Sequence, residues 1–365
     1  MQAGPAGLPT RGRPPAMRRA GSHPVEIWYG AEQVPESQRP SSGAASAGSA
    51  VTVGVFDGVH RGHQRILARV VERARALGPG CLAVAVTFDP HPLTVHRPGI
   101  DLAMIASLPD RLEAMAATGL DAVLVIPYTL GFADQSPEDF VRDWLEGLLG
   151  ARAVVVGADV RFGRDNSGDA DSLRAIGAAD GVEIEIVPEV LAPGGRRWSS
   201  TWARECLAVG DVHQAAEILG RPHRVRGVVI HGLRRGRELG FPTANLDAAT
   251  AGVVPPDGVY AGWLVRGGRG GASEGERLPA AISIGTNPTF DDVPARTIEA
   301  HVLGRADLDL YGEDVAVDFV SHLRPMLAFD SLEPLLERMR QDVLDTAEVL
   351  GSPVPEPVRP QDVTA

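Results

Sequence analysis

The sequence has little cysteine and no long apolar run. Its 365 residues include two cysteines, Cys81 and Cys206. This favours two thiols in a protein core over a disulfide framework, because disulfide-stabilised domains carry many more cysteines. No apolar run approaches the ~20 residues that a membrane span needs, and the N-terminus lacks the apolar segment of a secretory signal. We therefore expect a cytoplasmic protein with no membrane partner.

Positive charge is also in short supply. The chain has 35 basic and 47 acidic residues, a net charge of −12. Because a net negative charge would repel the phosphate backbone of a nucleic acid, we expect no nucleic-acid partner. The hydrophobic fraction of 44% is ordinary for a folded protein, and the length is sufficient for two domains. A homo-oligomer stays open.

Strands and helices alternate in the first half of the chain. An edge strand is expected at 25–29, and the Gly/Ser-rich segment 41–50 is typical of a flexible connector. Near-continuous apolar strands between amphipathic helices predict an α/β doubly wound parallel sheet with helices on both faces. The expected strands are 51–56, 81–88, 121–128, 151–159 and 182–187, and the expected helices are 60–77, 107–118, 136–149 and 170–179.

Residues 51–64 combine a strand, a glycine-containing turn and a helix that begins near His60. The turn residues are Gly54, Asp57 and Gly58. Unpaired backbone N–H groups and the positive end of the helix dipole make such a turn an anion site. His60 and His63 lie on one face of the first helical turn, and we interpret the segment as a nucleotide site. Metal binding is the alternative, but no nearby cysteine or carboxylate completes a zinc set.

The second half of the chain changes character at about residue 224. Short strands separated by Gly, Pro, Asn and Asp turns predict an antiparallel β-barrel. A C-terminal helix is expected at 331–349, capped by Ser331, with a buried stripe made of Leu335, Leu336, Met339, Val343 and Leu344. Two helices at 200–219 join the halves. The expected units are a disordered extension at 1–24, domains at 25–218 and 219–350, and a flexible tail at 351–365.

Eight segments in order resemble one family. They are GVFDGVHRGHQ at 54–64, VTFDPHP at 86–92, GADVRFG at 157–163, SSTWARE at 199–205, GFPTAN at 240–245, DGVYAGW at 257–263, IGTNPTF at 284–290 and IEAHVL at 298–303. The chain resembles the prokaryotic bifunctional riboflavin kinase/FMN adenylyltransferase (FAD synthetase) family over roughly residues 25–350. The resemblance implies a nucleotidyltransferase-type sheet followed by a riboflavin kinase barrel.

For the first domain, the resemblance implies that FMN and ATP give FAD and pyrophosphate. The FMN phosphate is already an anionic nucleophile, so the site must align two anions and neutralise charge. By motif match, His60 and His63 serve the α-phosphate, and Arg204 with Ser200 and Thr201 holds the β- and γ-phosphates. The other implied ATP-binding residues are Gly54, Phe56, Asp57, Gly58 and Asp159, and the flavin-side residues are Phe88, Asp89 and His91. Val160 stands where the family usually has an aromatic residue.

For the second domain, the resemblance implies transfer of the ATP γ-phosphate to the 5′-hydroxyl of riboflavin. A neutral alcohol needs a base, and Glu299 is the candidate because strand alternation places it opposite Ile298, Ala300 and Val302. Thr243 matches the family's Mg²⁺ ligand. Asn245 and the glycines of the 231–240 flap, Gly232 and Gly236, match phosphate-binding positions. His223 replaces a common aromatic residue.

Three alternatives remain open from the sequence. One half alone could be active, with the barrel reduced to a flavin holder. The chain could be a flavin- or nucleotide-binding regulatory protein without turnover. It could also be a nucleotidyltransferase with another phosphate acceptor, although that would leave the barrel unexplained. Outside the motif string, Arg204 would be read as a surface ion pair and Asp57 as a turn cap.

Overall fold

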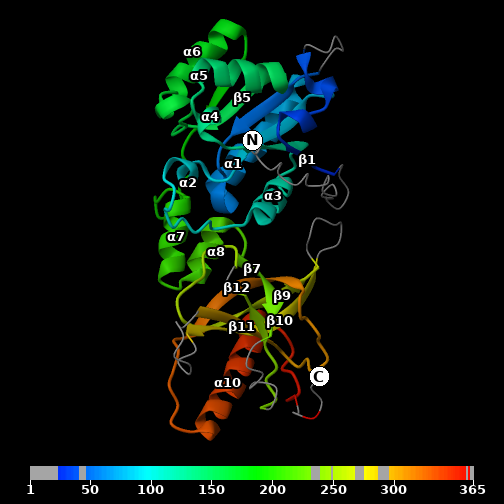
Figure 1. Ribbon diagram of the computed structural model, residues 1–365, viewed down its shortest axis with the longest axis vertical. Helices are drawn as coiled ribbons and strands as arrows, with labels where there is room; N and C mark the ends of the chain where they lie inside the picture. Colours follow the sequence, from blue (N-terminus) through cyan, green and yellow to red (C-terminus); the bar gives the residue numbers. More distant parts are fainter. Residues whose placement is uncertain are drawn as a thin grey trace, which may run out of the picture.

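The structure is a computed structural model with a parallel-sheet half and a barrel half. Figure 1 shows the sheet with its helices above, the barrel with α10 below, and α7 and α8 between them. The described residues are 24–40, 47–231, 239–247, 250–267, 275–286, 296–358 and 361.

The first half contains a six-stranded parallel sheet with the order β1-β4-β3-β2-β5-β6, which confirms the predicted sheet and its edge strand. The strands are β1 Glu26–Tyr29, β2 Ser49–Val53, β3 Leu82–Asp89, β4 Ala122–Pro127, β5 Ala151–Gly157 and β6 Glu183–Val187. Strand β2 lies between β3 and β5. The chain runs from β2 to β3 and β4 on one side and then crosses to β5 and β6 on the other side. The crevice at the carboxyl end of β2 is therefore the switch point where such sheets bind ligands.

Helices cover both faces of this sheet. They are α1 Arg61–Leu77, α2 Pro92–His96, α3 Leu108–Ala116, α4 Leu130–Ala133, α5 Pro137–Asp139, the π-helix η5 Phe140–Leu148 and α6 Ala170–Asp180. Alternate strand residues pack either against α1 and α3 or against η5 and α6. Ser107 and Ser136 cap their helices as expected, each accepting a hydrogen bond from the amide three residues on. The predicted helix 136–149 is confirmed, and its larger part, Phe140–Leu148, is π-helical.

Two predicted boundaries near β2 are wrong. The strand ends at Val53 rather than residue 56, because Phe56 adopts a left-handed backbone conformation with φ 53° that no strand accommodates. The strand also begins earlier, at Ser49. The end of the expected connector 41–50 is therefore structured, and Ser49 and Ala50 are fully buried.

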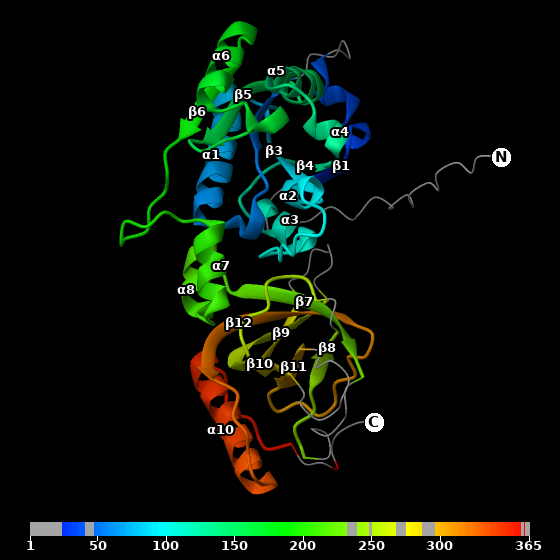
Figure 2. The same cartoon turned by 60° about the vertical axis from the view of Figure 1, so that its left-hand side comes forward.

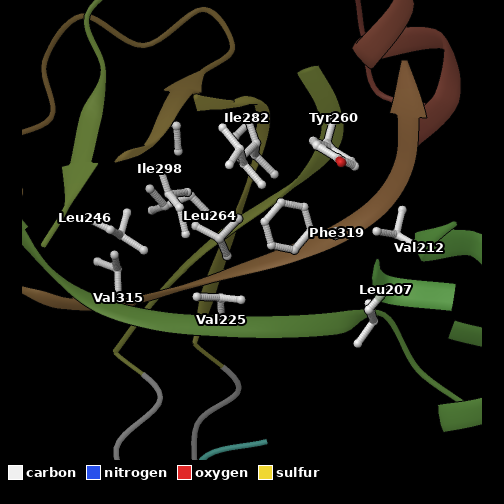
Figure 3. Packing of buried hydrophobic residues seen from close by; sticks show 14 of the residues in the cluster. Leu207, Val212, Val225, Leu246, Tyr260, Leu264, Ile282, Ile298, Val315 and Phe319 are labelled. Atoms are coloured by element: carbon white, nitrogen blue, oxygen red, sulfur yellow. The ribbon is translucent and has the colours of Figure 1, made fainter. Parts of the chain in front are cut away.

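The second half contains a closed antiparallel barrel with the order β10-β11-β8-β7-β12-β9, as predicted. Its strands are β7 His223–Ile230, β8 Ala244–Leu246, β9 Gly258–Arg266, β10 Glu276–Thr286, β11 Arg296–Val302 and β12 Asp314–Arg324. The three-residue β8 was not predicted. Inside the barrel Tyr260, Ile282 and Phe319 pack together, while Leu207 and Val212 approach from the helices outside (Figure 3).

Helix α10, Leu332–Leu350, lies against β9, β10 and β12. The predicted apolar stripe is confirmed in part. Its members Leu335, Leu336, Met339 and Val343 are half-buried, but Leu344 is 42% exposed, and the fully buried residues of the helix are Asp342, Thr346 and Ala347. The Asp342 carboxylate accepts hydrogen bonds from Arg324 at 2.6 and 2.8 Å. Ser331 occupies the N-cap position but forms no capping hydrogen bond.

Cys81 and Cys206 are both buried and unpaired, as predicted. None of the helices in the described part of the chain has the length and apolar character of a membrane span.

The two halves meet through α7 Ser200–Ala208, α8 Val212–Leu219 and a contact between α3 and β7. Figure 2 shows α3 facing β7 across the junction. Asp110 on α3 pairs with Arg226 on β7, with 2.7 Å between Oδ1 and Nη2. Both residues are buried, at 5% and 9% exposure. The ion pair therefore joins the sheet half to the barrel half within the interior.

Replacing Asp110 with asparagine should destabilise the protein by ~3 kcal/mol, because the buried Arg226 guanidinium then keeps only the more distant and more exposed Glu113 carboxylate, at 3.5 Å. The matched control is Asp171→Asn, which removes an exposed pair with Arg174 and should cost below ~1 kcal/mol. Denaturant-induced unfolding of both variants measures the difference. Equal effects would show that the α3–β7 pair has no special role.

Candidate functional sites

The first candidate site is the turn that follows β2 at the switch point. Its residues Asp57–Val59 form a short 3₁₀ turn, and His60 then caps α1 by accepting a hydrogen bond from the His63 amide at 3.3 Å. The imidazoles of His60 and His63 stack with 3.7 Å between ring centroids. The predicted pair is therefore brought together at the helix N-terminus, where backbone N–H groups attract an anion.

Both histidines are neutral near pH 7. Burial, followed by the nearby Arg197 charge, lowers the pKa of His60 to about 4. Burial and the neighbouring His60 hold the pKa of His63 well below its usual value. The buried Nδ1 of His63 has no hydrogen-bond partner among the described residues. Without ligand, the pair thus offers neutral imidazoles to a phosphate rather than two cations.

Asp57 lies beneath this turn with 4% of its surface exposed. Its carboxylate accepts hydrogen bonds from the amides of Ile105 at 3.0 Å and Ala106 at 3.3 Å, and it pairs with Arg204. Ser200 donates to the Asp57 carbonyl at 2.9 Å. The SSTWARE helix is therefore fastened to the phosphate turn, and the Nε of Arg204 remains buried without a partner in the described structure. Thr201 is exposed beside them.

Asp159 lies across the crevice, just beyond β5. It pairs with Arg197, whose Nη1 also contacts Glu189 Oε1 at 2.8 Å. The Asp159 and Arg197 charges both act on the pKa of His60, in opposite directions. Arg197 thus belongs to the same crevice although no sequence pattern marked it. Two adjacent arginines after two glycines, as at 194–197, give no periodic or motif signal that would have found Arg197.

The flavin-side candidates lie at the end of the adjacent strand β3. Phe88 is buried and its ring contacts Tyr128 and Phe132 at centroid distances of 5.4 and 5.9 Å. Asp89 ends the strand, and His91 caps α2 by accepting from the Leu93 amide at 3.0 Å. Tyr128 and Phe132 were missed, because their chain segment shows no motif. Val160 is partly buried against this half's core.

Burial lowers the pKa of His91, and the charges of Asp57, Arg204 and Arg111 also act on it. His91 therefore lies within electrostatic reach of the phosphate turn. The predicted nucleotide and flavin sides of the crevice adjoin one another.

The second candidate site is on the barrel. Glu299 on β11 faces away from the core that contains Ile298 and Ala300, as the alternation predicted. Thr243 donates to Glu299 Oε2 at 3.5 Å, and Asn245 Nδ2 donates to Thr243 Oγ1 at 3.2 Å. Burial raises the pKa of Glu299. A carboxylate with a raised pKa is a stronger base than a carboxylate with the ordinary pKa of an exposed glutamate.

A small cavity adjoins this group and is lined by residues including Pro242, Thr243, Arg305, Leu308 and Tyr311. His223 is a core residue, with its Nε2 2.6 Å from the Val253 carbonyl, and burial lowers its pKa to about 4. Gly232 and Gly236 lie outside the described residues. Among the described residues, no cluster of three His, Cys, Asp or Glu side chains could hold a metal ion.

Comparisons with known proteins identify a family for each half of the chain. The family model for FAD synthetase matches residues 43–202, and the model for riboflavin kinase matches residues 219–350. Bifunctional riboflavin kinase/FMN adenylyltransferases from Pseudomonas fluorescens and Listeria monocytogenes are 37% and 34% identical to this chain. The alignments cover 84% and 81% of this chain and 94% and 90% of those proteins.

The Escherichia coli K12 protein of the same name is 34% identical over 85% of this chain and 95% of its own. A solved structure titled as a macrolide-efflux protein from Streptococcus pneumoniae matches with a TM-score of 0.73 and 28% identity. It covers 88% of this chain and 98% of that one. The fold and the two family models define a flavin nucleotide transferase. The chain belongs to the bifunctional riboflavin kinase/FMN adenylyltransferase family.

Acidification from pH 7 to 4 should destabilise the protein partly through His60. The unfolded state binds a proton at this histidine below pH 6.5, whereas the folded state does so only near pH 4. The contribution of neutral His60 to the free energy of folding is therefore present above pH 6.5. It is lost as the pH falls to 4, by on the order of 2 to 3 kcal/mol. In denaturation experiments, the free energy of unfolding of His60→Gln should fall by that much less than that of wild type between pH 7 and 4. His213→Gln, at an exposed position on α8, should behave as wild type; equal pH slopes for the two variants would contradict the assignment.

Proposed function

We propose that the protein phosphorylates riboflavin to FMN in the barrel domain and adenylylates FMN to FAD in the sheet domain, using ATP in both steps. The observation that carries the proposal is that the structure brings together two separate groups of the candidate residues. One joins His60, His63 and Arg204 at the β2 turn, and the other joins Thr243 and Glu299 on the barrel. Family membership supports both activities.

In adenylyl transfer, an FMN phosphate oxygen bonds to the α-phosphorus of ATP while the bond to the β-phosphate oxygen breaks, and pyrophosphate leaves. No proton needs to move to start this step. The imidazoles of His60 and His63 bind and orient the α-phosphate, and Arg204 with Ser200 and Thr201 holds the departing phosphates. The partnerless Nε of Arg204 supports this role, because a buried donor is available for a phosphate oxygen. Phe88, Asp89 and His91 lie where the flavin would approach.

In the kinase step, the riboflavin 5′-hydroxyl oxygen bonds to the γ-phosphorus of ATP, ADP leaves, and Glu299 accepts the hydroxyl proton. Asn245 orients the Thr243 hydroxyl through their 3.2 Å hydrogen bond. Thr243, with phosphate oxygens of ATP, fits Mg²⁺, which takes oxygen ligands and few of them from protein. The ion supplies positive charge to the phosphates when bound. We propose Gly232 and Gly236 as parts of a flap over this nucleotide.

The substrates, the metal ion and the cellular location follow from the same proposal. Riboflavin, FMN and ATP are the partners, and Mg²⁺ accompanies ATP. We place the enzyme in the cytoplasm, where its substrates are dissolved. The net charge of −12 supports the absence of a nucleic-acid partner. A homo-oligomer remains compatible with the structure.

Chromatography of products tests the two activities directly. Protein given riboflavin, ATP and Mg²⁺ should form FMN and then FAD, and chelation of Mg²⁺ should stop FMN formation. FMN supplied without riboflavin should be converted to FAD. Formation of only one product would leave a single active half, and tight ligand binding without any product would favour the regulatory alternative.

Single substitutions should separate the steps. Glu299→Ala should lower riboflavin phosphorylation by ~100-fold or more while FMN is still converted to FAD, because the base serves only the alcohol. His63→Ala or Arg204→Ala should lower adenylylation by ~100-fold or more, because each removes charge stabilisation there, with phosphorylation retained. Steady-state rates of each half-reaction measure this. Loss of both activities in every variant would disprove two independent sites.

The two steps should also differ in their dependence on pH. Glu299 has to be ionised to accept a proton, and burial raises its pKa. The kcat/KM of the kinase step should therefore fall on acidification, beginning at a higher pH than for an exposed glutamate. Adenylylation should retain its rate through that range, because its nucleophile needs no base. Identical acid limbs for the two half-reactions would contradict the role of Glu299.

A further inference from the structure

The turn between β2 and α1 has a backbone conformation that needs support from outside. Phe56, Gly58 and Val59 have φ values of 53°, 74° and 44°. Positive φ is uncommon for residues with side chains and most costly for β-branched ones such as Val59, at ~1 to 3 kcal/mol each. Such a turn persists only where its surroundings hold it. The contacts that hold it therefore control the position of His60 and His63.

Arg111 supports the first end of the turn from α3. Its side chain is 2% exposed. Nη1 donates to the Val55 carbonyl at 2.8 Å, and Nη2 donates to the Phe88 carbonyl at 3.1 Å. A single guanidinium thus joins the start of the phosphate turn to the end of β3, where the flavin-side residues begin. No motif of the sequence includes this arginine.

Arg221 supports the second end of the turn from the opposite direction. It follows α8 and precedes β7, so it lies at the start of the barrel half. Its Nη2 donates to the Gly58 carbonyl at 2.9 Å, and Nη1 lies 3.5 Å from the Val59 carbonyl. A Cβ atom at Gly58 would meet Leu219 at 3.0 Å and Ile105 at 3.1 Å. The turn is therefore closely packed between elements of both halves.

Neither guanidinium has a carboxylate in direct contact within the described residues; both bind backbone carbonyls. A buried cation without a contacting anion is unfavourable by itself. It also raises the positive potential of its surroundings, which favours an arriving triphosphate. Geometry and charge at these two residues favour the same ligand, a nucleoside triphosphate.

We propose that Arg111 and Arg221 are positioning residues for adenylyl transfer, which hold the two ends of the 55–59 turn so that His60 and His63 meet the α-phosphate. This inference rests on the proposed adenylyl transfer to FMN. Because Arg221 belongs to the barrel half, the adenylyl site draws support from both halves of the chain.

The test compares Arg111→Met and Arg221→Met with Arg174→Met, an exposed arginine of α6. The first two should lower kcat for FMN adenylylation by ~10-fold to 100-fold and raise the KM for ATP by ~10-fold, because a misplaced turn both binds the phosphates less well and loses alignment at the reacting atoms. Riboflavin phosphorylation by the same polypeptide should stay within about twofold, which shows that the chain is folded. Arg174→Met should leave both rates unchanged.

Conservative variants separate positioning from folding. Arg111→Lys and Arg221→Lys keep the charge and one hydrogen bond, so they should recover part of the lost kcat. Their thermal unfolding and kinase rate should match wild type. Parallel losses of both activities in the Met and Lys variants would assign the arginines to folding alone. Unchanged adenylylation in the Met variants would equally overturn the proposal.

Binding of α,β-methylene-ATP separates this proposal from the proposed function. The analogue cannot be cleaved at its inner phosphate, so calorimetry reports its affinity whether or not FMN is the acceptor. Wild type should bind it at two sites, and the Met variants should show one of them weakened by ~10-fold. If wild type failed to convert FMN, that weakening would still support the positioning role, and unchanged binding would refute it.

Discussion

The buried carboxylate of Asp57 is the group on which the sheet half of the enzyme depends. It accepts hydrogen bonds from the amides of Ile105 and Ala106 and pairs with Arg204. Three segments that are far apart in the chain are thereby fastened to one turn: the loop before α3, the SSTWARE helix and the turn itself. Because an unpaired carboxylate in this environment would be strongly unfavourable, Asp57 fixes all three together and holds in place the residues that we propose to bind phosphate.

The two proposed sites differ in the charge of the nucleophile that each would receive and in their side chains. The sheet site receives anions on both sides of the reaction, and it combines neutral histidines with arginines. The barrel site receives a neutral alcohol, and there a buried carboxylate with a raised pKa is adjacent to a hydroxyl. The chemistry of each nucleophile thus accounts for the charge of the residues that surround it. Neither set could replace the other.

Features with local signals were predictable from the sequence. Alternation along β11 placed Glu299 outside the core, and the caps Ser107 and Ser136 followed from their positions before helices. Features that depend on distant partners were not predictable. Arg111 and Arg221 bind carbonyls 56 and 163 residues away. Strand β8 is too short for a periodic pattern, and the burial of Asp342 on α10 depends on a distant partner, Arg324.

Adjacent residues of α3 face different halves of the molecule: Asp110 reaches the barrel strand β7, and Arg111 reaches the loops of the sheet. An organism that encoded the two activities as separate polypeptides would have to rebuild this helix. Fission near residue 219 would expose Arg226 and Asp110 to water and would detach Arg221 from the loop it holds. One turn of α3 therefore links the two halves through side-chain contacts, in addition to their covalent connection along the chain.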